Sequence, residues 1–124
     1  MSDYSRNEGI IMTGGTLNAE AVAVGRRARA TVESARETLE ERGQADLAAK
    51  IDALLAALEA HRDEIPDPEK AFELTGRVAE ELERERPDKE SVEGFLARIA
   101  GAAGSVTSIV AAATAVGHAV AAVL

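Results

Sequence analysis

The chain of 124 residues contains no cysteine and no tryptophan, and only one tyrosine and two phenylalanines. Without cysteine it can form neither disulfides nor thiolate nucleophiles nor cysteine-based zinc sites. Because aromatic side chains are scarce, any core has to be built largely from Ala, Val, Leu and Ile, and each buried Ala removes less apolar area from water than Leu or Phe. A single small domain of this material has marginal stability, and oligomerisation is a common remedy.

Acidic residues outnumber basic ones, and the formal net charge is −8. A nucleic-acid interface needs a clustered basic face, so the sequence predicts no nucleic-acid partner. The segment from Met1 to Gly9 is polar and does not have the pattern of a signal peptide. We therefore expect a cytoplasmic location, with membrane association as an alternative that depends on the C-terminal segment.

Changes in residue composition and pattern along the chain predict three regions: a disordered leader at 1–9, a β-forming head at 10–32 and a helical domain at 33–124. Short β-prone runs in the head are separated by Gly, and Val22 and Val24 alternate with Ala, which gives a period of two. An intramolecular hairpin or a disordered tail remain alternatives for this region.

The stretch Asn18-Ala19-Glu20-Ala21-Val22-Ala23-Val24-Gly25-Arg26-Arg27-Ala28-Arg29-Ala30 resembles one head repeat of the trimeric autotransporter adhesins. In that family such repeats stack as rungs of a β-roll with three chains packed together. The rest of the chain departs from the adhesins, since it has no repeated rungs and no anchor barrel. The resemblance implies that oligomerisation residues lie in the head, namely Asn18, Ala21, Val22, Val24, Gly25, Ala28 and Ala30.

A shorter stretch, Val22-Ala23-Val24-Gly25, resembles the core of amyloid-type death-signalling motifs. Those motifs read Val/Ile-Gln-Val/Ile-Gly-x-x-Asn, whereas this chain has Ala23 in place of the Gln and Ala28 in place of the Asn. The amide ladders that lock such fibrils are therefore missing. Both resemblances imply self-association through β structure.

The remaining sequence predicts helices at about 34–42, 45–64, 68–85 and 88–123. Ser34 followed by Glu37 has the spacing of a capping box, and Asp67-Pro68 is typical of a helix start. The second helix carries an amphipathic stripe of Leu47, Ile51, Leu54, Leu55 and Leu58. The expected fold class is mainly α: a small helical bundle or hairpin with a long C-terminal helix and a short N-terminal β-forming, Gly-rich segment.

Apolar residues in the last predicted helix follow alternating steps of three and four, as in a heptad seam. The seam consists of Val92, Phe95, Ile99, Val106, Ile109, Val116 and Val120. From Ile99 to Leu124 there is no Asp, Glu, Lys or Arg, over roughly 39 Å if the segment is one helix. Two interpretations follow: a helix packed inside the protein, or a helix that contacts or enters a membrane.

No arrangement of residues predicts chemistry. His61 lies near acidic residues at a helix end, and His118 lies in an apolar helix without a nearby acid. Phosphate-binding loops, dinucleotide fingerprints and a Ser/His/Asp motif are not present in the sequence. We therefore expect no catalytic residues, no metal, no cofactor and no small-molecule substrate.

The function expected is that of a non-enzymatic, self-assembling interaction module, a homo-oligomer joined through the N-terminal β segment in a bacterial signalling or conflict system. The alternative is a membrane-acting effector whose uncharged segment, Ile99 to Leu124, inserts into bilayers.

Overall fold

The computed structural model describes residues 13–124, with side chains from Val22 onwards, and over this range the chain is helical without strands. The predicted leader at 1–9 and the start of the predicted head at 10–12 lie outside the described residues. The expected fold class, mainly α, is confirmed as a helical bundle. Its elements are α1 (Thr13–Glu41), α2 (Ala45–Ala60), the 3₁₀ turn η1 (Arg62–Glu64), α3 (Pro68–Glu83), α4 (Lys89–Ala102) and α5 (Thr107–Val123).

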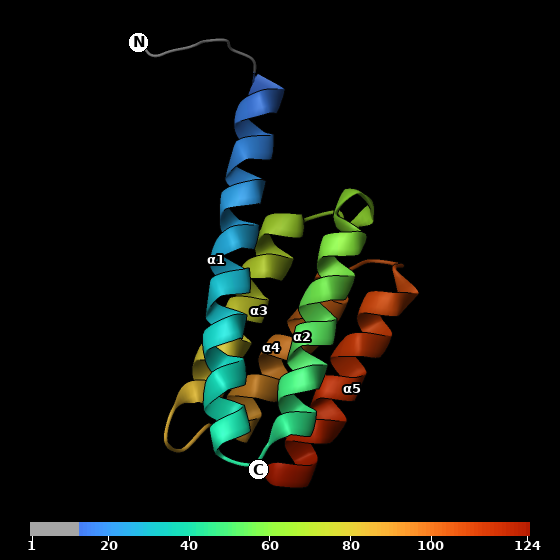
Figure 1. Cartoon of the computed structure of the whole chain (residues 1–124). Helices are drawn as coiled ribbons and strands as arrows, with labels where there is room; N and C mark the ends of the chain where they lie inside the picture. Colours follow the sequence, from blue (N-terminus) through green and yellow to red (C-terminus); the bar gives the residue numbers. More distant parts are fainter. Residues whose placement is uncertain (1–12) are drawn as a thin grey trace, which may run out of the picture.

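The five α-helices form a closed ring in the order α1, α2, α5, α4, α3, in which each helix contacts the next. Helix α2 also contacts α3 across the middle of the ring. The N-terminal turns of α1 extend beyond the ends of the other helices (Figure 1). Because the ring is closed, each helix buries one stripe of apolar residues in a single shared core.

Residues 13–32, predicted as part of a β-forming head, belong instead to the 29-residue helix α1. The buried residues of α1 follow one another at helical steps of three and four. This buried stripe consists of Val24, Ala28, Val32, Ala35 and Leu39. The alternation of Ala and Val suggested a period of two, but Ala has the highest helix propensity and the longer stripe runs through Leu39. Ser34, predicted as a helix N-cap, lies inside α1, where its hydroxyl donates to Glu83 across to α3 at 2.7 Å.

The end of α1 is a Schellman turn, because Gly43 adopts a positive φ of 77°. The amide of Gln44 donates to the carbonyl of Leu39, and the amide of Gly43 donates to that of Glu40. Beside this turn Arg42 donates to the carbonyls of Leu82 and Glu83 at the C-terminus of α3. The turn between α1 and α2 thus also supplies hydrogen bonds to free carbonyls at the C-terminal end of α3.

The connection from α2 to α3 contains the helix start that the sequence indicates. Asp67 accepts a hydrogen bond from the amide of Lys70 at 3.2 Å, and Pro68 occupies the first turn of α3. Helix α2 covers residues 45–60 of the predicted segment 45–64, and η1 follows. The predicted stripe of α2 is fully buried at Leu47, Ile51, Leu54, Leu55 and Leu58.

The single C-terminal helix predicted at 88–123 is divided into α4 and α5. Gly104 in the connection adopts a positive φ of 66°, which reverses the chain, and a Cβ at this position would lie 3.2 Å from Cγ of Pro66. The heptad pattern continues across the break because α4 and α5 both direct apolar faces to the same core. The pattern therefore indicates which faces are buried but not that the helix is continuous.

Candidate functional site

The residues predicted to join chains in an oligomer lie along α1 and do not share one surface. Val24, Gly25 and Ala28 are buried within the chain, whereas Val22 and Ala30 are exposed. Asn18 and Ala21 are in the helix, but their side chains lie outside the described residues. The buried members pack against this chain's own helices, so the described residues do not form the expected β interface.

Gly25 is the point at which Arg62 crosses α1. A Cβ on Gly25 would lie 2.9 Å from Nη2 of Arg62, and the Arg62 guanidinium lies over the ring of Phe72 at 5.1 Å from its centroid. A cation over an aromatic face is attracted by the ring quadrupole. The close approach thus gives Gly25 a role within the chain.

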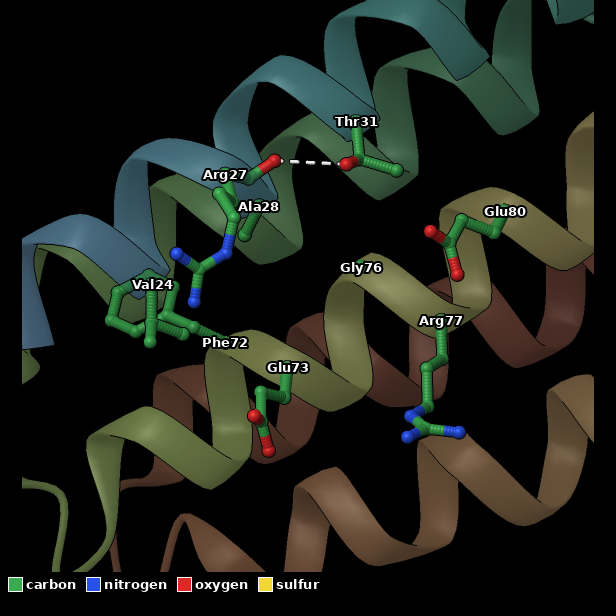
Figure 2. A pocket seen from close by; sticks show the side chains of 9 residues that line it. All are labelled: Val24, Arg27, Ala28, Thr31, Phe72, Glu73, Gly76, Arg77 and Glu80. Atoms are coloured by element: carbon green, nitrogen blue, oxygen red, sulfur yellow. Dashed lines mark hydrogen bonds between the residues drawn. The ribbon is translucent and has the colours of Figure 1, made fainter. Parts of the chain in front are cut away.

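A groove of about 360 Å³ runs between α1 and α3 (Figure 2). Arg27 points from α1 towards α3, while Glu73 and Arg77 point away from α1. Gly76 leaves space between the helices, since a Cβ there would meet nothing within 4 Å. The groove is open and carries both signs of charge, so it does not favour a ligand of one charge.

Ion pairs tie α1 to α2. Arg29 contacts Asp52 at 2.7 Å and donates to both carboxylate oxygens of Glu59, while Arg36 lies 3.5 Å from Asp52. The hydrogen bond to Glu59, with a further one to Asp52, raises the pKa of Arg29 above its usual value. About a third of each of the Arg29, Asp52 and Glu59 side chains is exposed, so solvent screens these pairs.

The predicted helix seam is buried except for one residue, although it is divided between two helices. Phe95 is only partly buried. The buried members are Val92, Ile99, Val106, Ile109, Val116 and Val120. Buried in this way, the seam joins α4 and α5 to the core of their own chain.

A second groove, about 370 Å³ in volume, lies between α4 and α5. Leu96 lies in it, with Glu93, Thr114 and His118 as its polar members. Its remaining lining consists of small residues: Ala97, Ala100, Ala113, Gly117 and Ala121. We call these nine residues the α4–α5 groove.

The α5 side of this groove carries no charge. Helix α5 has no charged side chain, and it exposes Val110 (36%) and Val123 (43%), with Leu124 (40%) following it. A Cβ on Gly117 would meet only Leu96, at 3.9 Å, so the chain's own packing does not require glycine there. No helix in the described part of the chain is both long and apolar enough to cross a membrane.

The turn after α2 brings together a serine, a histidine and a glutamate. Nε2 of His61 lies 3.2 Å from Oγ of Ser108 on α5, and Nδ1 of His61 lies 2.9 Å from Oε2 of Glu64 on η1. The sequence indicates only the His61–Glu64 neighbourhood, because Ser108 is 47 positions from His61. Among the side chains that the structure describes, from Val22 to Leu124, no group of three or more His, Asp or Glu residues could hold a metal ion.

Comparison with known proteins gives a family but no described activity. No curated protein and no solved structure matches the chain. A family model, described as a family of unknown function (DUF5955), matches residues 35–124. The match includes only the last quarter of α1, from residue 35, but all of α2 to α5, the α4–α5 groove and the Ser108–His61–Glu64 cluster. Since this is most of the chain, the protein belongs to this family of unknown function (DUF5955).

Proposed function

We propose that the protein is a self-associating interaction module in which the α4–α5 groove and the surface beside it pack against the same surface of a second copy. The observation that carries this proposal is the groove itself, which is lined mainly by small residues and has one acidic member, Glu93, in an otherwise highly charged chain. The proposal keeps the self-association expected from the sequence but assigns it to helix packing at the C-terminal end.

The distribution of charge favours a second copy as the occupant. Each copy carries a net charge of −8, so most contacts between two copies would bring like charges together. Helix α5 is the only α-helix in residues 13–124 without a charged side chain, and α4 has none after Arg98. A two-fold contact pairs a surface with itself, and the uncharged α5 side of this surface can meet its own copy without bringing like charges together.

Gly117 supports a close approach by a helix from outside the chain. Glycine in a helix interior costs about 1 kcal/mol relative to alanine, and here no neighbouring group would clash with a Cβ. Ala113 and Ala121 lie one turn away on either side, so the small residues form a row along α5. Such a row allows the backbones of two helices to approach closely.

The size of the surface predicts weak association. Helix α5 has 17 residues and is about 26 Å long, and with α4 beside it the strip is about 20 Å wide. The resulting area, roughly 500 Å² per copy, is below the roughly 800 Å² per partner of a standard stable interface. We therefore expect a dimer whose population depends on protein concentration.

Two variants on α5 form a matched pair for the test. Ala121→Glu places a carboxylate in the α4–α5 groove, where it would be desolvated between two copies. Ala111→Glu makes the same change at an exposed position of α5 that does not line the groove. Light scattering after size exclusion over a concentration series should give a dimer for the wild type and Ala111→Glu, and a monomer for Ala121→Glu. A wild type that stays monomeric throughout, or an Ala121→Glu variant that dimerises normally, contradicts the proposal.

The membrane-acting alternative has less support. The uncharged segment from Ile99 to Leu124 is not one helix, because Gly104 reverses the chain within it. Its apolar faces are also covered by α2 and α3.

A further inference from the structure

The cluster of Ser108, His61 and Glu64 lies outside the α4–α5 groove and has its own chemistry. We infer that Ser108 is an activated nucleophile, with His61 as its general base, that accepts acyl groups from small esters. This inference goes beyond the proposed function and rests on different residues. It can therefore be tested separately.

The distances fit the roles. A nucleophile and its base must lie within hydrogen-bonding reach, with a third group orienting the base. The ionised carboxylate of Glu64 only accepts hydrogen bonds, so the Nδ1 atom 2.9 Å away carries the imidazole proton. Nε2 is then the acceptor, and it lies 3.2 Å from Oγ of Ser108. The neutral imidazole is thus in the tautomer that can take the serine proton.

The position of Ser108 in α5 supplies the second requirement, which is stabilisation of negative charge. Ser108 is the second residue of α5, and no side chain caps this helix. The amides of Ile109 and Val110 donate to the carbonyl of Val106. Among the described residues the amides of Thr107 and Ser108 have no backbone acceptor, so they are left for an oxyanion at the positive end of the helix dipole.

Exposure sets the class of substrate. Ser108 is exposed, and 62% of the Glu64 side chain is accessible to solvent. A shallow site of this kind has no walls to hold a large acyl chain, so small acyl esters with good leaving groups are the expected substrates. Glu64 is a positioning residue, and solvent screening makes its effect smaller than that of His61.

The reaction transfers the acyl group in two balanced steps. In the first, Nε2 of His61 takes the proton from Oγ of Ser108 while Oγ attacks the ester carbonyl carbon. The tetrahedral intermediate collapses, the alcohol leaves with the proton from Nε2, and an acyl ester remains on Ser108. In the second, water attacks this ester with His61 as base, which releases the carboxylic acid and restores the Ser108 hydroxyl.

The test uses the full chain with p-nitrophenyl acetate as substrate and a fluorophosphonate as trapping reagent. We expect Ser108→Ala and His61→Gln to lower the rate of p-nitrophenol release at least tenfold, since a general base contributes about 100-fold or more. Ser105→Ala, which removes another exposed serine in the preceding turn, should leave the rate unchanged. The fluorophosphonate should add one group, on the peptide that contains Ser108, and helical circular dichroism should match the wild type for every variant.

Two results would overturn the inference. If Ser108→Ala keeps the wild-type rate while His61→Gln loses it, the imidazole reacts alone and Ser108 is not the nucleophile. If both variants keep the wild-type rate and the label is absent from Ser108, the cluster is a hydrogen-bonded contact without this activity. For Glu64, the ¹⁵N shifts of the His61 ring test positioning, because Glu64→Gln should move proton occupancy away from Nδ1.

Discussion

Alanine substitutions at Gly25 and Gly76 can separate the effect of side-chain packing on stability from the effect of helix propensity. Both are in helix interiors, Gly25 in α1 and Gly76 in α3. A Cβ on Gly25 would lie 2.9 Å from Nη2 of Arg62, whereas a Cβ on Gly76 would meet nothing within 4 Å. Substitution by alanine raises helix propensity equally at the two sites, so any difference in stability comes from the contact with Arg62.

The expected magnitudes differ enough to measure. Gly76→Ala should raise the free energy of unfolding by about 0.5–1 kcal/mol, the usual gain of alanine over glycine in a helix. Gly25→Ala has the same gain but displaces the Arg62 guanidinium from Phe72, at a cost of about 0.5–1 kcal/mol, so its net effect is near zero. Gly25→Val adds a branched side chain to a close contact and should lower stability by about 1–3 kcal/mol.

The assay is urea unfolding followed by helical circular dichroism at one fixed protein concentration, because self-association would add stability as concentration rises. In an Arg62→Ala background the close contact is gone, and Gly25→Ala should then stabilise the chain as much as Gly76→Ala does. If Gly25→Ala already stabilises the wild type by the full amount, Arg62 does not pack over α1 as described.

Three further predictions concern single contacts. Glu59→Gln should lower the free energy of unfolding by less than about 1 kcal/mol, and added salt should reduce the difference, because the pair with Arg29 is about a third exposed. The Ser91 hydroxyl donates a hydrogen bond to the Asp88 carboxylate and lowers the pKa of Asp88, so Ser91→Ala should raise that pKa when the carboxyl is titrated by NMR. Asp88 therefore adds stability above the pKa of its unfolded form, and this contribution is lost as pH falls through the lower folded pKa. In Ser91→Ala, the free energy of unfolding measured in urea should depend less on pH over that window. Gly104→Ala should destabilise the chain by at least about 1 kcal/mol in the same unfolding assay, since alanine does not tolerate its positive φ of 66°, and an unchanged midpoint would contradict this.

Local sequence signals were sufficient for α2 and α3. The leucine stripe of α2 predicts a buried face, and all five of its residues are buried. Asp67-Pro68 predicts the start of α3, where Asp67 indeed accepts from the amide of Lys70. These signals depend on strongly apolar residues and on capping chemistry within a few positions, so they do not need the tertiary structure.

Weak apolar residues explain why the part of α1 up to residue 32 was predicted as β structure. Its buried stripe includes Val24, Ala28, Val32 and Ala35, and Ala contributes too little hydrophobicity for the helical period to stand out. The short alternation around Val22 and Val24 was therefore the stronger local pattern. At the other end of the chain, the heptad steps continue through Gly104, since two helices facing one core can keep the same register.

The candidate sites were beyond local sequence signals. The sequence contains small residues at Ala113, Gly117 and Ala121, but they line a groove with α4 only because the chain reverses at Gly104. Ser108 meets His61 only because α5 returns along α2. Both sites result from the order of helices in the ring, which short patterns do not specify.

The most direct test of self-association through α4 and α5 is a dilution series of ¹H–¹⁵N NMR spectra of the full chain. The account predicts concentration-dependent shifts of amides that line the α4–α5 groove, including those of Ala97, Gly117 and Ala121, with little change along α1 and α3. Shifts confined to α1, or spectra that do not change with concentration, would contradict it.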